Sequence, residues 1–370
     1  MKILFDYQAF TMQSHGGVSR YFVNLAKEIF KTENKPKIFA PVHRNIFLSK
    51  LPSELIDGHY FKYFLPRTIS LINSYNSFKL QKFLKNNQPD ILHETYYKKK
   101  RYKNYKLPVV ITVYDMIHEL FRENFPTNDL TSKYKFESIK RADHIICISN
   151  NTKKDLIELY NIPSNKISVV YLASDFNINL DTQENKKLIN NFKPFLLYVG
   201  QRNGYKNFNK FIKSFALSKK LMENFQIICF GGGKFTKNEL SKINSLGYYE
   251  GQVIYLAGDD NTLANLYSLA TSLVYPSMYE GFGLPLLEAM SIGCPVLCSN
   301  TSSLPEVAGN AAIYFDPNDT EDISSSIENF VFSESEKIKI QKLGFERCKK
   351  FSWSLCAQNT LKVYSDLIKY

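Results

Sequence analysis

Two glutamates stand on either side of a glycine-rich turn in the second half of the chain. The turn has the sequence YEGFGLP over residues 279–285, and Glu288 follows Glu280 with seven residues between them. Its proline suits the first position of a helix, so the N–H groups of Gly283 and Leu284 would point at an incoming anion. Either glutamate alone could cap the turn or complement the helix dipole. The pair favours a site in which one carboxylate meets a sugar and the other meets ribose hydroxyls.

Two cations follow another apolar run that ends in glycine. Residues 195–199 are predicted as a strand, and Arg202 and Lys206 come shortly after it. Arginine offers a planar fork and lysine a compact charge, so the two suit a diphosphate. They would also neutralise a departing nucleoside diphosphate, which is a metal's task in other enzymes. A solvated basic loop would explain either residue alone.

Further glycines lie where a backbone could approach a ligand closely. Gly232 is the middle of a triplet after a predicted strand over residues 226–230, and Gly17 opens a helix after the first strand. We interpret Gly232 as a contact to the nucleoside and Gly17 as a contact to the donor diphosphate or the acceptor. A simple tight turn is the competing interpretation of each. Neither a dinucleotide-binding nor a phosphate-loop motif is present.

The first half offers weaker candidates. Asp115 and His118 follow the predicted strand over residues 109–113, and a basic run with the sequence YYKKKRYK covers residues 96–103. The run suits an anionic membrane surface or a lipid-diphosphate acceptor, nucleic acid, or a solvated loop. Within the run, we expect Lys98, Lys99, Lys100 and Arg101 to meet the acceptor or the membrane. Arg20, outside the run, is a further candidate for this contact.

The elements that position these residues alternate between short apolar runs and amphipathic helices. This alternation occurs in both halves and predicts an α/β fold twice over, each with a parallel sheet buried on both faces. Ligands should then lie beyond the carboxyl ends of the strands. Polar residues 175–193 are the expected linker. A last helix after Trp353 carries apolar residues for packing against the first domain, namely Leu355, Leu361, Val363, Tyr364 and Leu367.

Composition narrows the class of protein. The 370 residues are 44% hydrophobic, which suffices for two cores, and no run of eighteen uncharged apolar residues predicts a membrane-spanning helix. Residues 1–180 hold 27 Lys and Arg against 16 Asp and Glu, so the positive net charge lies almost wholly in the first half. An anionic partner or a lysine-rich solvated surface would explain it equally. Six scattered cysteines without zinc-type spacing predict reduced thiols in the cytoplasm and no metal site.

Together and in order, several motifs resemble those of the retaining, family-4 type glycosyltransferases with the GT-B fold. The resemblance rests on Glu280 and Glu288 as an E-x7-E pair and on the segments GGVSR (16–20), ISNNTK (148–153), GQR (200–202), KNF (206–208), GGG (231–233) and SLPEV (303–307). It implies two Rossmann-like domains facing across a cleft and a transfer that retains the anomeric configuration. Where members often carry His-Asp, this chain has Tyr114-Asp115, so either His118 or Tyr114 would replace the usual histidine.

The resemblance and the residues lead to one set of expectations. Residues 1–178 are expected to bind the acceptor, residues 192–351 the donor, and residues 352–370 to form the returning helix. The catalytic candidates are Glu280, Arg202, Lys206, Asp115 and His118, and the donor-binding candidates are Gly17, Arg202, Lys206, Gly232, Phe282, Gly283, Leu284 and Glu288.

The expected donor is GDP-mannose or a related GDP-sugar, ahead of a UDP-sugar, with no cofactor and no metal. The expected acceptor is a glycan or lipid-linked glycan of cell-surface polysaccharide, met by a cytoplasmic enzyme peripheral to the inner face of the membrane. A basic nucleic-acid-binding protein and a nucleotide-sugar epimerase are the alternatives. The first would carry bound nucleic acid, and the second would act on the donor with no acceptor present.

Overall fold

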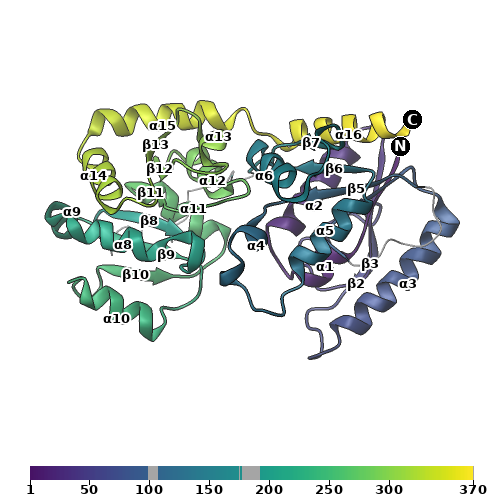
Figure 1. Cartoon of the computed structure of the whole chain (residues 1–370), viewed down its shortest axis with the longest axis horizontal. Helices are drawn as coiled ribbons and strands as arrows, with labels where there is room; N and C mark the ends of the chain where they lie inside the picture. Colours follow the sequence, from purple (N-terminus) through teal and green to yellow (C-terminus); the bar gives the residue numbers. More distant parts are fainter. Residues whose placement is uncertain (99–106, 175, 177–191, 370) are drawn as a thin grey trace. The chain divides into compact units, whose positions relative to one another are not determined.

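The computed structural model describes residues 1–98, 107–174, 176 and 192–369. The chain divides into two compact units (Figure 1). Unit 1 comprises Met1–Leu120, Phe125–Leu172 and Trp353–Tyr370, and unit 2 comprises Phe121–Asn124 and Ala173–Ser352. Of residues 175–193, which were expected to form the linker, only 176, 192 and 193 lie in the described part. Over the described chain, no helix is long and apolar enough to cross a membrane.

Unit 1 is built on a seven-stranded parallel sheet in the order β3-β2-β1-β4-β5-β6-β7. Two of its central strands, over residues 91–94 and 109–113, are buried along their whole length, as expected when helices cover both faces of a parallel sheet. The strands are β1 (Lys2–Phe5), β2 (Lys35–His43), β3 (Ile56–Tyr60), β4 (Ile91–Glu94), β5 (Val109–Val113), β6 (His144–Cys147) and β7 (Ile167–Val169).

The helices of unit 1 flank this sheet. They are α1 (Gln8–Met12), α2 (Gly17–Phe30), α3 (Ile69–Asn87), α4 (Ile117–Leu120), α5 (Thr131–Arg141), α6 (Asn150–Tyr160) and α16 (Trp353–Ile368), with 3-10 turns at Leu48–Lys50 and Ser164–Lys166. A further 3-10 turn, Arg122–Asn124, belongs to unit 2. The last helix, α16, packs on α2 in the same unit (Figure 1). Tyr364 of α16 bonds His93 of β4 at 2.6 Å, while Leu355, expected on the packing stripe, is exposed.

Unit 2 is built on a six-stranded parallel sheet in the order β10-β9-β8-β11-β12-β13. The strands are β8 (Phe195–Val199), β9 (Gln226–Phe230), β10 (Val253–Leu256), β11 (Ser272–Tyr275), β12 (Val296–Ser299) and β13 (Ala312–Phe315). The strands predicted over residues 195–199 and 226–230 coincide with β8 and β9. The two sheets confirm the expected pair of Rossmann-like folds.

Helices also surround the second sheet. They are α8 (Phe208–Leu217), α9 (Lys219–Asn224), α10 (Lys237–Ser245), α11 (Asp260–Leu269), α12 (Leu284–Ser291), α13 (Leu304–Ala308), α14 (Thr320–Val331) and α15 (Glu334–Cys348), with a 3-10 turn at Gly204–Lys206. Aromatic rings of β8 and α8 fill much of the core beneath them, among them Tyr198, Phe208 and Phe211.

Each sheet reverses its strand order once, and this decides where ligands can bind. In unit 1 the chain passes from β1 to β2 on one side and to β4 on the other, so the switch point lies between β1 and β4. In unit 2 it lies between β8 and β11. Loops diverge beyond the carboxyl ends of strands at such points and leave a crevice. Ligands are therefore expected to bind at the residues after β1, β4, β8 and β11.

Candidate active site

At the switch point of unit 2, Lys206 and Glu280 form an ion pair. Lys206 follows β8 and Glu280 follows β11, and the Lys206 Nζ lies 2.6 Å from the Glu280 carboxylate. Their side chains are 15% and 10% exposed, so the pair is largely removed from water. The Lys206 Nζ also donates to the Tyr275 hydroxyl at 3.3 Å. Burial, and then Glu280, hold the pKa of Tyr275 well above its usual value, so this hydroxyl stays protonated.

Backbone and serine contacts fix the loop that carries Glu280. Its N–H donates to the Ser302 hydroxyl at 2.9 Å, and the Ser303 hydroxyl donates to the carbonyls of Glu280 and Phe282 at 2.9 Å each. Ser302 adopts a left-handed φ of 53°, which is uncommon for a serine. The loop after β12 therefore braces the loop after β11.

The glycine-rich turn then leads directly into α12. Gly283 precedes the helix with φ at 104°, and a Cβ there would lie 2.9 Å from Leu304, so only glycine fits without rearrangement. Leu284 begins the helix and Pro285 stands in its first turn, as predicted. The Phe282 ring is buried against Phe351 with 5.9 Å between ring centroids. A ligand at this turn would therefore meet the Phe282 main chain.

Glu288 lies one turn into α12 and is half-buried. The Tyr267 hydroxyl of α11 donates to its carboxylate at 3.3 Å. Burial and the nearby Glu288 raise the pKa of Tyr267 well above its usual value, so it remains a donor. Tyr267 thus orients Glu288, a role that the sequence did not indicate.

Arg202 is buried and engaged within its own unit. Its Nε bonds the Glu239 carboxylate at 2.7 Å, and its Nη atoms donate to the carbonyls of Gly231 and Gly233 at 2.9 and 2.7 Å. Partial burial acts to raise the pKa of Glu239, but bonds from Arg202 and Thr236 prevail and hold it below its usual value. Arg202 therefore holds the glycine triplet against the start of α10.

The glycine triplet is packed against the loop after β8. All three glycines have positive φ, and a Cβ on Gly232 would lie 2.7 Å from the Gly200 carbonyl oxygen. The backbones of the two loops therefore approach as closely as glycine permits. Arg202, Lys206, Gly232, Glu280 and the start of α12 all follow the carboxyl ends of unit 2 strands.

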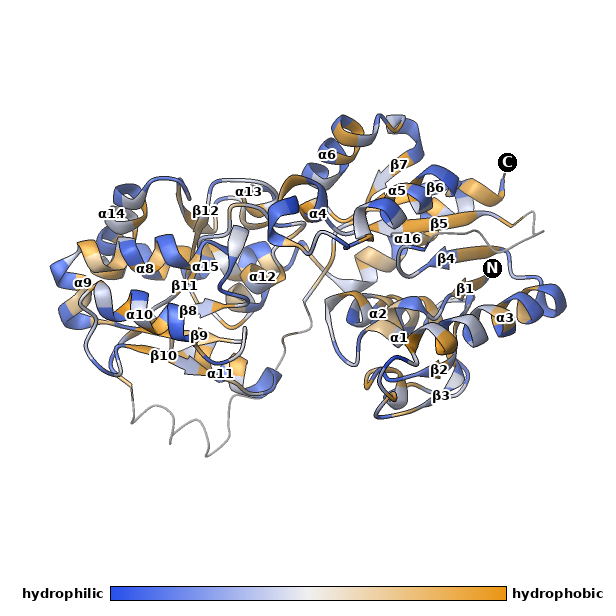
Figure 2. Ribbon diagram, turned by 60° about the horizontal axis from the view of Figure 1, so that its bottom comes forward, coloured by the Kyte–Doolittle hydropathy of each residue, from blue (hydrophilic) through white to orange (hydrophobic). Residues whose placement is uncertain are grey.

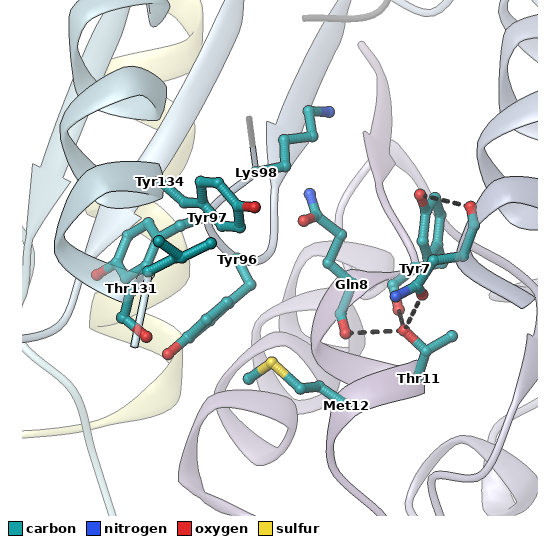
Figure 3. A pocket seen from close by; sticks show the side chains of 11 residues that line it. Tyr7, Gln8, Thr11, Met12, Tyr96, Tyr97, Lys98, Thr131 and Tyr134 are labelled. Atoms are coloured by element: carbon teal, nitrogen blue, oxygen red, sulfur yellow. Dashed lines mark hydrogen bonds between the residues drawn. The ribbon is translucent and has the colours of Figure 1, made fainter. Parts of the chain in front are cut away.

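Unit 1 carries a pocket of about 400 Å³ at its own switch point (Figure 3). Residues after β1 and β4 line it, together with α3 and α5. Figure 3 shows Tyr96, Tyr97 and Tyr134 on one side and Gln8 and Met12 on the other. The remaining lining residues are Tyr7, Thr11, Asn73, Lys98, Leu130 and Thr131. Of all the residues that line the pocket, only Tyr96, Tyr97 and Lys98 belong to the basic run over residues 96–103 that the sequence indicated as a candidate.

A buried network of charges holds Lys98 at this pocket. Its Nζ lies 2.7 Å from Glu94 and 3.6 Å from Asp6, and Arg141 bonds Glu94 at 2.9 Å. Burial lowers the pKa of Lys98, against the opposing effect of the two carboxylates. The neighbouring Lys99, Lys100 and Arg101 lie outside the described residues.

Asp115 and His118 lie beyond β5 in unit 1 and are not among the residues that line the pocket. Lys135 reaches the Asp115 carbonyl at 2.8 Å, its carboxylate at 3.8 Å and Glu119 at 2.7 Å. The His118 ring stacks on Phe125, and burial, with Lys135, lowers its pKa so that the ring is neutral at pH 7. The Tyr114 hydroxyl donates to the Thr95 carbonyl at 3.0 Å.

The two remaining candidates lie on α2. Gly17 is exposed and begins the helix, with no atom within 4 Å of a Cβ built there. Arg20 lies over the Phe47 ring at 5.2 Å. Among the described residues, no group of three His, Cys, Asp or Glu side chains could hold a metal ion.

Two family models match adjoining parts of the sequence. One, "Glycosyltransferase Family 4", matches residues 15–177, and the other, "Glycosyl transferases group 1", matches residues 180–345. Together they cover most of the chain.

Curated relatives and a solved structure agree with these matches. The "O-antigen chain mannosyltransferase B" of Escherichia coli is 34% identical over 62% of each chain, and "O-antigen chain mannosyltransferase RfbU" of Salmonella typhimurium is 34% identical over 52% of each. These alignments span about half to three-fifths of each relative's length. HepE of Anabaena, solved with UDP-glucose, is 17% identical over 99% of this chain and 100% of its own, with a TM-score of 0.75, a likeness of fold. The chain belongs to the GT-B glycosyltransferases of the family-4, group 1 type.

Proposed function

We propose that the chain is a retaining, metal-independent hexosyltransferase that moves mannose or a related sugar from a nucleoside-diphosphate sugar to a glycan of the cell surface. The observation that carries the proposal is the buried Lys206–Glu280 pair at the switch point of unit 2, immediately before the N-terminus of α12. This arrangement offers positive charge and backbone N–H groups to a diphosphate, and a carboxylate to the sugar attached to it.

Each residue of the unit 2 site has a separate role in this proposal. Lys206 and the N–H groups of Gly283 and Leu284 stabilise the leaving diphosphate, Glu280 positions the hexose, and Glu288 holds the ribose hydroxyls. Arg202 shapes the glycine loop against the nucleoside. A direct contact between Arg202 and the phosphates would require its guanidinium to leave Glu239.

The reaction then needs no group beyond the donor, the acceptor and these side chains. An acceptor hydroxyl oxygen attacks the anomeric carbon from the face of the leaving group. The bond from that carbon to the phosphate oxygen breaks, and the hydroxyl proton passes to the departing phosphate. Positive charge at the diphosphate lowers the barrier because negative charge develops there.

Mannose is favoured because both reported relatives are named O-antigen mannosyltransferases. GDP-mannose is the corresponding donor, and a UDP-sugar is the second choice, since HepE binds UDP-glucose. The pocket of unit 1 suits the acceptor, because its tyrosines offer rings and hydroxyls to a glycan. The basic first half favours an acceptor linked to lipid at the inner face of the membrane.

The test is transfer in the presence of EDTA. Purified protein is incubated with GDP-mannose or UDP-glucose and a lipid-linked glycan extract, and the products are identified by mass spectrometry and by the anomeric coupling in NMR. We expect an α-linked mannose with EDTA present, since the donor is α-linked. An inverted product would contradict retention, loss in EDTA would contradict metal independence, and donor conversion without an acceptor would indicate an epimerase.

A further inference from the structure

An exposed apolar surface covers one side of unit 1 at α3 and the segment that leads into it. Its apolar members are Tyr60, Phe61, Tyr63, Leu65, Ile69, Leu71, Tyr75 and Phe78, all exposed. Tyr63, Leu65, Leu71 and Phe78 are the most open, at 79%, 77%, 71% and 67%. Large apolar side chains gathered at this density on a surface mark an interaction site. We call these residues, with Lys62, Arg67, Lys79, Lys82 and Lys85, the α3 surface.

The helix presents this surface because its two faces differ. Leu71, Tyr75, Phe78, Lys82 and Lys85 recur at steps of four, three, four and three residues, so they form one stripe, and all five are exposed. The residues on the other face are held by unit 1, as the next contacts show. Figure 2 shows hydrophobic and hydrophilic residues alternating along α3.

The opposite face of α3 is fixed to the sheet. The Asn76 side chain donates to the Val42 carbonyl at 2.8 Å and accepts from the Val42 N–H at 2.9 Å, while Leu80 and Leu84 are buried. Phe83 packs against Phe39 of β2 with 4.5 Å between ring centroids. Because the inner face of α3 is packed against unit 1 in this way, the outer stripe has a defined orientation.

The charge of the α3 surface identifies its partner. From residue 58 to residue 89 the sequence contains no Asp or Glu, and its charged residues are Lys62, Arg67, Lys79, Lys82 and Lys85. Lys62 and Lys79 lie over the rings of Tyr63 and Tyr75, at 5.3 and 5.6 Å from the centroids. We propose that the α3 surface docks the chain onto a bilayer that contains anionic lipid.

This combination of side chains fits a bilayer better than it fits the other partners. Exposed aliphatic side chains such as Leu65 and Leu71 gain by entering hydrocarbon but do not stack on bases, which disfavours single-stranded nucleic acid. A symmetric contact between two copies would place five like charges against five others. Tyrosines and lysines at a bilayer surface can instead keep their polar ends in the headgroup layer.

The position of α3 suggests what this docking would do, and this step rests on the proposed function. Asn73, on the inner face of α3, lines the pocket of unit 1, where its carbonyl accepts from Tyr7 at 3.0 Å and its amide oxygen accepts from Thr11 at 3.0 Å. A chain seated on the bilayer through the outer face of α3 would thus hold the pocket close to an acceptor anchored in lipid. Lipid binding itself is testable without donor or acceptor.

The experiment is co-sedimentation of the full chain with vesicles. The vesicles contain phosphatidylglycerol and phosphatidylcholine in equal parts, and phosphatidylcholine alone serves for comparison. We expect binding to the first and little to the second. Raising the NaCl concentration from about 0.1 M to about 1 M should weaken binding, because the Debye length falls from about 10 Å to about 3 Å.

Two paired variants locate the contact. Leu71→Ser with Phe78→Ser should weaken binding about tenfold or more, since two apolar side chains no longer enter the bilayer. Lys79→Glu with Lys82→Glu should have a similar effect on anionic vesicles, at about fivefold or more per residue. The matched controls lie on unit 2, where Leu217→Ser with Ile338→Ser and Lys213→Glu with Lys242→Glu change exposed residues in the same way and should leave vesicle binding unchanged.

The outcomes separate this proposal from the proposed function. Thermal stabilisation by nucleoside diphosphate should be equal in the wild type and the α3 variants, because the donor site lies in unit 2. The proposal is overturned if the wild type ignores anionic vesicles, or if the α3 variants bind them as the wild type does. It is also overturned if light scattering shows a dimer that these variants convert to monomer without any binding of vesicles.

Discussion

Replacing Lys206 with methionine separates the structural role of its ion pair from its proposed catalytic role. The substitution removes the charge and keeps most of the side-chain volume. In the wild type the Glu280 side chain is only 10% exposed, and its carboxylate lies 2.6 Å from the Lys206 amine. The variant lacks that amine. Loss of one partner from a buried pair costs about 3–5 kcal/mol. Because the Glu280 loop retains some access to water, we expect about 2–3 kcal/mol here, or a fall in the unfolding temperature of roughly 5–10 °C.

The double variant Lys206→Met with Glu280→Gln is the decisive control. Without either charge, most of the lost stability should return, whereas turnover should stay about 100- to 1,000-fold below wild type because the leaving diphosphate loses the charge of Lys206. Stability is measured by thermal unfolding, and turnover by release of nucleoside diphosphate in the presence of acceptor. Equal instability in the single and double variants would refute the pairing argument. Recovery of turnover in the double variant would refute the catalytic role of Lys206.

Three further predictions concern the donor site and the fold of unit 1. Glu288→Ala should weaken donor binding with little change in kcat, and titration calorimetry with the diphosphate would detect this; an unchanged dissociation constant would remove Glu288 from the ribose. Gly232→Ala should lower nucleotide affinity and stability together, by about 1–3 kcal/mol in stability, because its Cβ would lie 2.7 Å from the Gly200 carbonyl; binding titration and thermal unfolding at wild-type values would contradict this. Burial lowers the pKa of His93 to about 3, so below pH 6.5 the unfolded chain takes up a proton that the folded chain does not. As the pH falls from 6.5 towards the folded pKa, this proton uptake should lower the free energy of unfolding by about 1.4 kcal/mol per pH unit. His93→Gln should reduce that slope in unfolding curves recorded across this range.

The sequence predicted β5, β8 and β9 because strands buried on both faces of a sheet are mainly apolar. It did not predict β2 and β3. β2 contains Pro36 and Pro41, which argue against a strand, yet its register with β3 shifts between Phe39 and Val42, where Pro41 is tolerated. β3 is an edge strand with little apolar character. Local pattern therefore fails at the irregular register of β2 and at the sheet edge formed by β3.

The candidate site was predicted as separate motifs rather than as contacts. Lys206 and Glu280 are 74 positions apart, and they meet because β8 and β11 are neighbours in a sheet whose order the sequence does not state. The bond of Arg202 to Glu239 depends on the same topology. The tyrosine pocket of unit 1 was missed because its walls come from the residues after β1 and β4 and from α3 and α5, which only the fold brings together.

The central claim is that unit 2 binds a nucleoside-diphosphate sugar without a metal. It is tested most directly by a thermal-shift panel of GDP, UDP, ADP, TDP and CDP, each with and without EDTA. At a hundred times its dissociation constant, a ligand stabilises the folded state by about 2.7 kcal/mol, which is a readily measured shift. We predict stabilisation by one diphosphate, GDP in the first place, that is insensitive to EDTA and much reduced in Glu288→Ala. The absence of a shift with every nucleotide, or a shift abolished by EDTA, would contradict the claim.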